Sequence, residues 1–363
     1  MTQYRKLKTS MIVARADHFP QQQNVLVLAR PEAFAVELVR RDMPAMQVDE
    51  AALRILSAGI CGTDLHILKW NAWAASAYCP PFALGHEFCA EVVDLGANVS
   101  HIARGDRVVA ETHLSCGHCG QCRANRRHTC GNLRVFSRLD RGAFADHAIV
   151  PAALLRRVPE GVPSALASLF EPLGIAVRAA MTGNVAGKTV LITGCGPIGL
   201  LAIAVARRFG AHRIVASDVA ASRLELALKL GADAAIDVAH QALSDGVGDA
   251  VIDVAIEASG NIGAINDALA CVMTGGMLIL TGMPEAAVPL DLARHVLLRE
   301  VTIRGLYGRL IDETWLAAER LMTSPKFDLT PLITHSFALE DFAAAFACAT
   351  SGQAGKVLFR IAD

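Results

Sequence analysis

Apolar and polar residues follow two different patterns along this chain of 363 residues. In the first third, short apolar runs rich in β-forming residues are separated by turn residues such as Pro31, Pro44, Gly96 and Gly105. Short apolar runs between turn signals predict strands, so we expect an irregular, Greek-key-like β domain here. The predicted strands are Val25–Leu28, Ala35–Arg40, Ala51–Leu56, Ala90–Val93 and Arg107–Ala110.

From about residue 175 the apolar runs alternate with helix-like segments, which predicts βαβ units and a parallel sheet. Gly275 and Gly276 are expected to turn the chain from a helix into the last of these strands. The predicted strands are Val190–Thr193, Ile214–Ser217, Val251–Glu257 and Met277–Thr281, and the predicted helices are Ile198–Phe209, Arg223–Leu230 and Ile262–Met273. Two further helices, Glu313–Met322 and Glu340–Thr350, precede a final strand, Lys356–Arg360, and this segment either closes the second domain or returns to the first.

Composition indicates a folded protein of two or three domains. Hydrophobic residues make up 53% of the chain and charged residues 19%, which allows a sizeable core and argues against disorder. The formal net charge is −1 and no long run of like charge occurs, so nothing indicates binding to nucleic acid or to an acidic membrane surface. We interpret residues 1–23 as a disordered or packed extension, because Asp17 and Gln21–Gln23 fit a transit peptide poorly.

The most apolar stretch, Thr189–Ala206, does not predict a membrane span. Gly194, Gly196, Pro197 and Gly199 interrupt it in the middle, whereas a span needs a continuous apolar helix of ~20 residues. It is better interpreted as a buried strand, a turn and a buried helix. Because no secretory signal is visible either, we expect a cytoplasmic protein with no membrane association.

The turn within this stretch carries a nucleotide-binding motif. Gly194, Gly196 and Gly199 form a G-x-G-x-x-G pattern between an apolar strand and an apolar helix, and Asp218 follows the next strand. Gly194 would allow the tight turn, Gly196 the approach of a pyrophosphate, and Gly199 close packing of helix against strand. Asp218 would accept hydrogen bonds from the ribose and repel a 2′-phosphate, which favours NAD over NADP. Arg223 could weaken that preference or stack on the adenine.

Four of the ten cysteines lie within 15 residues, at Cys116, Cys119, Cys122 and Cys130. Four thiolates at this spacing can fill a tetrahedral site, and a four-cysteine zinc site is closed to water and therefore structural. An iron–sulfur cluster is the competing interpretation. His118 and His128 are additional donors that we expect at the surface rather than bound to the metal.

A second group of metal-binding residue types is dispersed along the chain. Cys61, Thr63 and His66 lie close together, His86 is followed by Glu87, and Glu171 stands just before the second domain. A catalytic zinc site uses about three protein ligands and keeps one position open, a requirement that Cys61, His86 and one carboxylate would meet. Spacing alone leaves open whether these residues share a metal ion.

With these motifs in hand, the sequence resembles the zinc-containing medium-chain dehydrogenases. The resemblance runs from about residue 25 to the end, and within that superfamily it is strongest to the branch of L-threonine 3-dehydrogenases. The segments that carry it are Gly59–His66 with its continuation to Trp73, Gly85–Glu87, Gly105–Val108, the four cysteines, Gly194–Gly199, Leu306–Arg309, Glu313–Trp315 and Ser351–Lys356.

The resemblance implies a fold and a set of expected boundaries. The α/β chain would combine a GroES-like β-rich catalytic domain with a Rossmann domain, a doubly wound parallel sheet that binds NAD. The expected catalytic domain comprises residues 24–174 and 312–363, and the expected Rossmann domain comprises residues 175–311. The resemblance also implies one catalytic and one structural zinc per subunit, a small alcohol or amino-acid substrate, and a homotetramer.

The resemblance further implies roles for single residues. Cys61 and His86 match ligands of the catalytic zinc, Glu87 matches a third ligand, and Glu171 matches an acidic position that ligates the metal or assists the proton relay. Thr63 and His66 match the relay pair, and His113 matches a histidine associated with substrate choice. The positions that match cofactor contacts, besides the glycines, are Ile198, Asp218, Arg223, Thr281, Gly282, Met283, Leu306 and Tyr307.

One sequence feature and three rival functions bear on the expected activity. Ile175 and Arg178 depart from the polar and histidine-like residues that the family pattern would place after Glu171. A polyol or vicinal-diol dehydrogenase would share every metal and nucleotide motif and differ only in its pocket. A catalytically silent binding scaffold would have lost Cys61, Thr63 or His86, all of which are present, and a zinc-independent quinone reductase would lack both cysteine groups.

Overall fold

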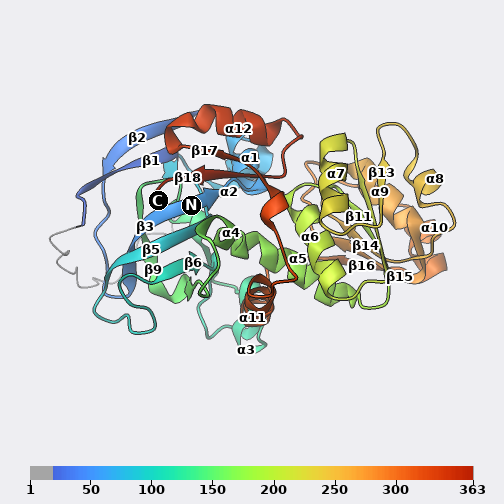
Figure 1. Cartoon of the computed structure of the whole chain (residues 1–363), viewed down its shortest axis with the longest axis horizontal. Helices are drawn as coiled ribbons and strands as arrows, with labels where there is room; N and C mark the ends of the chain where they lie inside the picture. The colour runs from blue at the N-terminus through green and yellow to red at the C-terminus, as the bar shows by residue number, and fades with distance from the viewer. Residues whose placement is uncertain (1–18, 363) are drawn as a thin grey trace.

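The computed structural model describes residues 19–362, which form two lobes joined by a long buried helix (Figure 1). Residues 1–18, most of the predicted N-terminal extension, lie outside the described part. Strand β1 begins at Gln22, so the end of that expected extension already belongs to the first lobe. None of the helices within residues 19–362 is long and apolar enough to cross a membrane.

The first lobe is a β structure built from two main sheets. One sheet has three strands in the order β2-β1-β4. The larger sheet has seven strands, of which six follow the order β10-β6-β5-β3-β18-β17, and the seventh, β9, also pairs with β3. The five strands predicted from the N-terminal pattern are all present. The strands of this lobe are β1 Gln22–Leu28, β2 Val36–Asp42, β3 Glu50–Gly59, β4 Phe82–Ala83, β5 Glu87–Leu95, β6 Arg107–Ala110, β7 His113–Leu114, β8 Arg134–Val135, β9 His147–Pro151 and β10 Leu155–Arg157.

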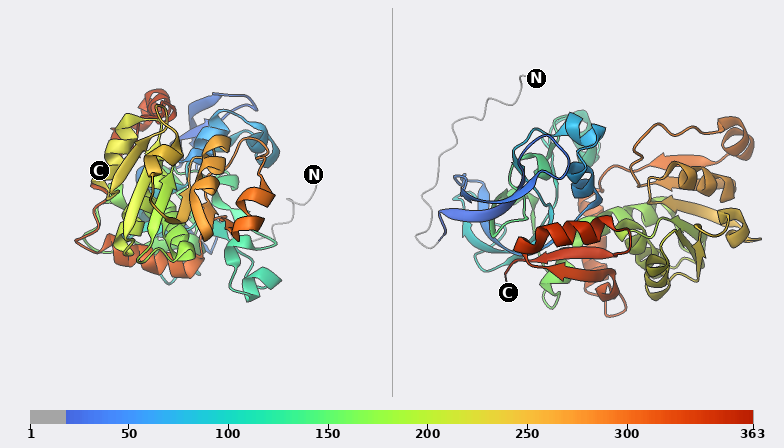
Figure 2. Two further views of the ribbon diagram at one scale, coloured as in Figure 1. Left: turned by 90° about the vertical axis from the view of Figure 1, so that its right-hand side faces the viewer. Right: turned by 90° about the horizontal axis from the view of Figure 1, so that it is seen from above.

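The C-terminal segment returns to this first lobe, which decides between the two arrangements left open by the sequence. Strand β18, Lys356–Arg360, pairs antiparallel with β3, and Leu358 lies opposite Gly59. Strand β17, Ile333–Phe337, extends the sheet next to β18. Figure 2 shows this red segment lying with the blue and teal lobe, away from the yellow and orange one.

The second lobe contains the predicted parallel sheet, with helices on both faces. All neighbouring strands in the order β13-β12-β11-β14-β15-β16 run parallel, as expected for a doubly wound fold. The strands are β11 Thr189–Thr193, β12 Arg213–Asp218, β13 Ala234–Asp237, β14 Ile252–Glu257, β15 Val272–Leu280 and β16 Thr302–Gly305. The helices are α6 Pro197–Arg208, α7 Ala221–Lys229, α8 Leu243–Val247, α9 Ile262–Cys271 and α10 Leu292–His295.

One predicted turn in this lobe is wrong. Strand β15 begins at Val272 and runs through Gly275 and Gly276, so helix α9 ends at Cys271 and not at Met273. The pairing of β15 with β14 shifts register between Val272 and Met277, which marks an irregularity where a turn was expected. Gly276 is needed there for packing, since a Cβ atom would lie 2.6 Å from Val272 and 2.8 Å from the carbonyl oxygen of Asp253.

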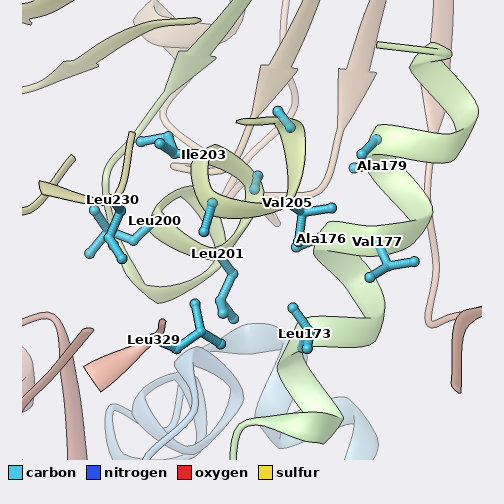
Figure 3. Packing of buried hydrophobic residues seen from close by; sticks show 14 of the residues in the cluster. Leu173, Ala176, Val177, Ala179, Leu200, Leu201, Ile203, Val205, Leu230 and Leu329 are labelled. Atoms are coloured by element: carbon cyan, nitrogen blue, oxygen red, sulfur yellow. The ribbon is translucent and has the colours of Figure 1, made fainter. Parts of the chain in front are cut away.

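Helix α5, Phe170–Gly183, joins the lobes and was not predicted from the sequence. It crosses the expected domain boundary at residues 174/175 and is buried along most of its length. Figure 3 shows Leu173 and Ala176 on α5 beside Leu201 and Val205 on α6, all in one apolar core. The remaining helices are α1 Gly62–Leu68, α2 Ala72–Ala77, α3 Gly120–Arg123, α4 Ser164–Ala167, α11 Ile311–Met322 and α12 Phe342–Thr350.

Candidate functional site

The first candidate ligand, Cys61, caps the N-terminus of helix α1. Its thiol accepts a hydrogen bond from the backbone N–H of Thr63 at 3.5 Å, and the Asp64 carboxylate accepts one from the N–H of Cys61 at 2.9 Å. This reciprocal capping box fixes the direction in which the thiol points. The same helix carries Thr63 and His66, so one short element positions three of the predicted site residues.

The thiol of Cys61 meets His86 and Glu87 although these residues lie on different elements. One ligand atom from each of the three lies within 4.8 Å of the other two. His86 and Glu87 are buried, and His86 Nδ1 has no hydrogen-bond partner among the described residues. The structure therefore brings together the dispersed residues that spacing alone could not connect.

The electrostatics of this group fit a bound cation. Burial raises the pKa of the Cys61 thiol, and the negative charge of Glu87 raises it further. Burial also raises the pKa of Glu87, with the nearby Glu171 adding to the effect. Burial lowers the pKa of His86, but the charges of Cys61 and Asp64 outweigh it and leave that pKa well above its ordinary value. A divalent cation would supply the positive charge that these groups otherwise obtain from protons.

A buried lysine from the C-terminal strand holds Glu87. The ammonium of Lys356, on β18, forms an ion pair with Glu87 Oε2, and both side chains are 1% exposed. Gly59 leaves the space for this pair, because a Cβ atom there would lie 2.7 Å from Glu87 Oε2 and 2.7 Å from Lys356 Cε. The returning C-terminal segment is thus part of the site.

A second buried ion-pair network surrounds Glu171. Arg309 pairs with Glu171 and lies 3.6 Å from Glu111, while Thr112 donates a hydrogen bond of 3.0 Å to Glu171. Burial opposes ionisation of Glu111, but Arg309 and a hydrogen bond from His113 outweigh it and lower the pKa of Glu111 to about 2. Glu171 lies outside the close group formed by Cys61, His86 and Glu87, so the geometry favours Glu87 as the third metal ligand.

These residues line a cavity of about 250 Å³. Of the predicted site residues, it brings together Cys61, Thr63, His86, Glu87, His113, Glu171, Ile198, Met283 and Tyr307. It also contains residues to which the sequence gave no role: Trp73, Tyr78, Ser137, Arg138 and Arg309. Arg309 and Trp73 belong to segments that carry the family resemblance. No sequence motif, however, indicates that their side chains line the cavity.

A larger cavity of about 710 Å³ adjoins the first and lies between helix α1 and the loops of the parallel sheet. Cys61, Thr63, Ile198 and Met283 line both cavities. The larger one is also lined by the predicted residues His66, Thr281 and Gly282, and by the loop 258–263, which the sequence did not identify. Leu306 and Arg223 line neither cavity.

The glycine-rich turn has the geometry of a phosphate-binding turn. Gly194 has a φ of 85°, and a Cβ atom on Gly199 would lie 1.8 Å from the carbonyl oxygen of Gly194. A Cβ atom on Gly196 would meet nothing within 4 Å, so the backbone there is open to a ligand at the N-terminus of α6. Each of the three glycines thus has the environment that its predicted role requires.

Asp218 and Arg223 both make contacts within the protein. Asp218 ends β12 and accepts hydrogen bonds from the N–H groups of Cys195, at 2.6 Å, and Ala220, at 2.9 Å. This fixes the carboxylate beside the glycine-rich turn. The guanidinium of Arg223 donates to the carbonyl oxygen of Ala354, so it ties helix α7 to the C-terminal segment.

His66 is half-buried at the edge of the larger cavity. Burial lowers its pKa, the charge of Glu285 raises it, and Lys69 lowers it. Asn71 accepts a hydrogen bond from the N–H of Ala74 through Oδ1, so its amide nitrogen donates to His66 Nδ1 at 2.8 Å. The neutral ring therefore carries its hydrogen on Nε2.

The four cysteines lie in a small segment of the first lobe, called here the Cys116–Cys130 lobe. Their thiols come together at the distances expected for a site that holds a single ion. Their Sγ atoms lie 3.5 Å (Cys119–Cys122), 3.8 Å (Cys119–Cys130) and 4.0 Å (Cys116–Cys122) apart. A tetrahedral zinc with Zn–S bonds of ~2.3 Å separates its sulfurs by about 3.8 Å. A multi-iron cluster would hold its thiolates at the outside of a larger unit, so one ion fits better. Hydrogen bonds from the backbone, that of His118 first, lower the pKa of Cys116 to about 6.

The two histidines of this lobe differ in position. His118 is exposed, as expected, and hydrogen-bonds to the carbonyl oxygen of Cys116. His128 is 3% exposed, so the prediction that it lies at the surface is wrong. Burial lowers its pKa to about 4, and Arg178 and His113 add to the effect.

The two departures from the family pattern have different consequences. Ile175 lines the smaller cavity. Arg178 is buried and donates hydrogen bonds to the carbonyl oxygens of Tyr307, at 2.7 Å, and Gly308, at 3.0 Å. Arg178 therefore supports the backbone of the segment that carries Arg309 and Tyr307.

Comparison with family models matches two parts of the chain. Residues 47–160 match the alcohol dehydrogenase GroES-like domain, and residues 197–324 match the zinc-binding dehydrogenase domain. Among curated proteins, an L-threonine 3-dehydrogenase of Pyrococcus horikoshii is 39% identical over 94% of this chain and 99% of its own length. An L-threonine 3-dehydrogenase of Pseudoalteromonas translucida is 40% identical over 87% of this chain and 94% of its own.

Solved structures agree on the fold. A zinc-binding dehydrogenase of Sinorhizobium meliloti bound to NADP superposes with a TM-score of 0.85, at 26% identity, over 94% of this chain and 100% of its own. The alcohol dehydrogenase of a Thermus species superposes with a TM-score of 0.83, at 28% identity, over 93% of this chain and 99% of its own. The predicted combination of a GroES-like domain with a Rossmann-type domain is confirmed.

Proposed function

The chain belongs to the family of zinc-binding alcohol dehydrogenases, and from this premise we propose that it oxidises the secondary alcohol of L-threonine with NAD, forming 2-amino-3-oxobutanoate and NADH. One observation carries the proposal: the group of Cys61, His86 and Glu87 lies where a substrate-sized cavity meets the larger cleft beside the parallel sheet. The relatives of about 39% identity that are named for threonine support this choice of substrate.

Cys61, His86 and Glu87 would hold the catalytic zinc, and the four cysteines at 116, 119, 122 and 130 would hold a structural zinc. A bound catalytic zinc lets an alcohol ionise near neutral pH, and a bound nicotinamide accepts the hydride. Burial opposes ionisation of Glu87, and the ion pair with Lys356 favours its ionised form. Arg309 holds Glu171, which lines the same cavity, in a separate ion pair. Thus two carboxylates share one cavity with separate cationic partners.

The hydroxyl proton of the substrate would leave along helix α1. Thr63 lines both cavities and stands one helical turn from His66, which borders the larger cavity. Thr63 would accept the proton and His66 would release it at the edge of the molecule. Since Asn71 donates to His66 Nδ1, uptake of a proton there requires that hydrogen bond to open. Burial, which lowers the pKa of the ring, favours release of that proton.

The cofactor would occupy the larger cleft, with its pyrophosphate at the N-terminus of α6. Gly196 leaves that approach open, and Ile198, Thr281 and Met283 line the cleft towards the metal ligands. The Asp218 carboxylate at the end of β12 would repel a 2′-phosphate, which supports NAD over NADP. Measuring turnover with both cofactors tests this preference directly.

A substrate panel tests the proposed reaction. Purified enzyme with measured zinc content should form NADH from L-threonine with a higher kcat/KM than from sorbitol or 2,3-butanediol. A preference for either neutral substrate would instead identify a polyol or diol dehydrogenase. His113→Ala should alter threonine kinetics, because the His113 ring borders the cavity and packs against Tyr307 at 5.5 Å between ring centroids. Unchanged kinetics and substrate preference would remove His113 from substrate recognition.

We also propose self-association into a tetramer in the cytoplasm. Strand β16 forms an edge of the parallel sheet, and nearby Leu297 and Leu298 are 73% and 82% exposed, which supports an interface along this edge. The ten cysteines are unbridged, and free thiols persist in reducing compartments. Sedimentation analysis of the purified protein gives the number of subunits, and Leu298→Glu should reduce it.

A further inference from the structure

The outer wall of the smaller cavity contains a positively charged side chain on a rigid support. Arg138 ends the short 3-10 helix Phe136–Arg138, and its guanidinium carbon lies 5.4 Å from the ring centroid of Tyr78. The Tyr78 ring stacks on Phe82 at 4.9 Å, and its hydroxyl lies 3.0 Å from the hydroxyl of Ser137. Tyr78 is therefore a fixed platform that orients the guanidinium.

The charges that line this cavity are balanced except at Arg138. Glu87 pairs with Lys356, and Glu171 pairs with Arg309. In contrast, no carboxylate of residues 19–362 forms an ion pair with Arg138, although its side chain lines the same cavity. The positive charge of Arg138 is also felt inside the cavity, because it lowers the pKa of Tyr307 against the dominant effect of burial.

We infer that Arg138 binds the carboxylate of the substrate and thereby selects hydroxy acids over neutral alcohols. This inference rests on the proposed function, since it assigns the substrate class of the same cavity. The metal-ligand group stands at one part of the cavity wall and Arg138 at another, so a small molecule can present its hydroxyl to the first and its carboxylate to the second. A guanidinium suits this task because its planar donors match both carboxylate oxygens.

His113 is a weaker candidate for holding the carboxylate. Its Nδ1 lies 2.8 Å from Glu111, whose pKa of about 2 keeps that partner ionised, so Nδ1 carries a hydrogen and donates it to Glu111. The remaining nitrogen, Nε2, then donates to a substrate only when the ring is protonated. A guanidinium is a permanent cation in proteins, and no carboxylate within residues 19–362 forms an ion pair with that of Arg138.

The decisive experiment compares substrates with and without a carboxylate in matched variants. Arg138→Gln should raise the KM for L-threonine by roughly 10- to 100-fold, because a charged hydrogen-bonded contact is lost, and should leave kcat within about twofold. The KM for L-threoninamide, which lacks the carboxylate, should not change. Arg138→Lys should restore part of the affinity for threonine. Arg134→Gln removes an exposed arginine that lines a different cavity and should behave as the wild type.

Zinc content and NADH binding, measured for each variant, separate a local effect from misfolding. An unchanged KM for threonine in Arg138→Gln, or an equal loss with threoninamide, would overturn the role of Arg138 while leaving the proposed reaction intact. If the wild type ignores threonine but oxidises 3-hydroxybutyrate with the same dependence on Arg138, the proposed reaction fails and the inference stands. If a sugar-alcohol phosphate is the only substrate that depends on Arg138, the carboxylate assignment is wrong.

Discussion

The two candidate metal centres are built in opposite ways. The four thiols of the Cys116–Cys130 lobe come from one stretch of chain, and backbone N–H groups of the same lobe donate to them, such as those of Cys116 and Asn132 to Cys130 Sγ at 3.3 Å each. The other centre takes Cys61 from a helix cap, Glu87 from the first position of β5 and His86 from the residue before it. It also depends on Lys356 from the C-terminal strand.

This difference determines what each centre can do. A local, four-thiolate site is complete in itself, so its ion contributes to folding and leaves no position for a substrate. An assembled site has fewer ligands and obtains its remaining contacts from distant elements, so its reactivity can be tuned by residues far away in the sequence. The first centre should therefore respond to mutation mainly in stability, and the second mainly in activity.

The largest expected effect is on turnover at the assembled centre. Cys61→Ser should lower kcat by roughly 10³-fold or more, because loss of a metal that contributes several kcal/mol of transition-state stabilisation removes the driving force for alcohol ionisation. The melting temperature and the affinity for NADH should stay close to those of the wild type. Stopped-flow kinetics, NADH fluorescence and thermal unfolding measure the three quantities, and full turnover in this variant would contradict the assignment.

The local centre should show the reverse behaviour. Cys119→Ser should reduce zinc from two ions to one per subunit and lower the melting temperature by roughly 10 °C, since a few kcal/mol of metal-linked folding energy is lost. Limited proteolysis should then cut first within the Cys116–Cys130 lobe. Zinc analysis and calorimetry check the outcome; a variant that keeps both ions and its stability would show that the four thiols are not a metal site.

The same contrast explains what the sequence could predict. The group of four thiols was predictable because cysteines this close in sequence are also close in space. The glycine-rich turn was predictable because the strand, the glycines and the acidic residue occur in a fixed order along the chain. That Cys61 and His86 lie close together in space could be predicted only from the fold or from a family resemblance. Lys356 could not be identified as the partner of Glu87, because the pairing of β18 with β3 brings together residues almost 300 positions apart.

Helix α5 and the cavity wall illustrate a second limit. Apolar residues surround α5 on nearly all sides, so it has no amphipathic pattern from which a helix and its direction could be deduced. Arg138 and Tyr78 belong to no motif, and only their meeting across the chain gives Arg138 a platform. His128 was misplaced at the surface because its burial, to 3% exposure, arises from tertiary packing that no local sequence pattern indicates.

An intermediate effect is expected at Gly59, where the absence of a side chain leaves room for the ion pair that supports the assembled centre. Gly59→Ala would place a methyl group 2.7 Å from both Glu87 Oε2 and Lys356 Cε, so this buried ion pair would have to shift. Displacement of these supporting groups should weaken zinc binding by roughly 10- to 100-fold. Gly305→Ala, on β16, is the matched control because a Cβ atom there meets nothing within 4 Å. Zinc retention during titration with a chelator distinguishes the two, and equal retention would show that the ion pair has no part in holding the metal.

The smallest expected effect concerns two exposed charges near His66, one from each lobe. Glu285 raises the pKa of His66, and Lys69, whose ammonium lies 4.0 Å from Glu285, lowers it. If neutral His66 must accept the proton, kcat rises with pH through the pKa of this ring. Glu285→Gln removes the charge that favours the protonated ring, so the pKa of His66 falls. The rising limb of the plot of kcat against pH then moves to lower pH. Lys69→Met should move the limb to higher pH.

Each shift should be only roughly 0.2 to 0.5 pH units, because the two charges are exposed and screened by solvent. The measurement is kcat at saturating NAD between pH 5 and 9, which removes any effect of Glu285 on cofactor affinity. The double variant should fall near the wild type, since the two opposing charges are lost together. Cys119→Ser should leave the limb in place, as the local centre holds none of these charges. Shifts of both single variants in the same direction would exclude His66 as the group that controls the limb, and the proton would then leave by another route.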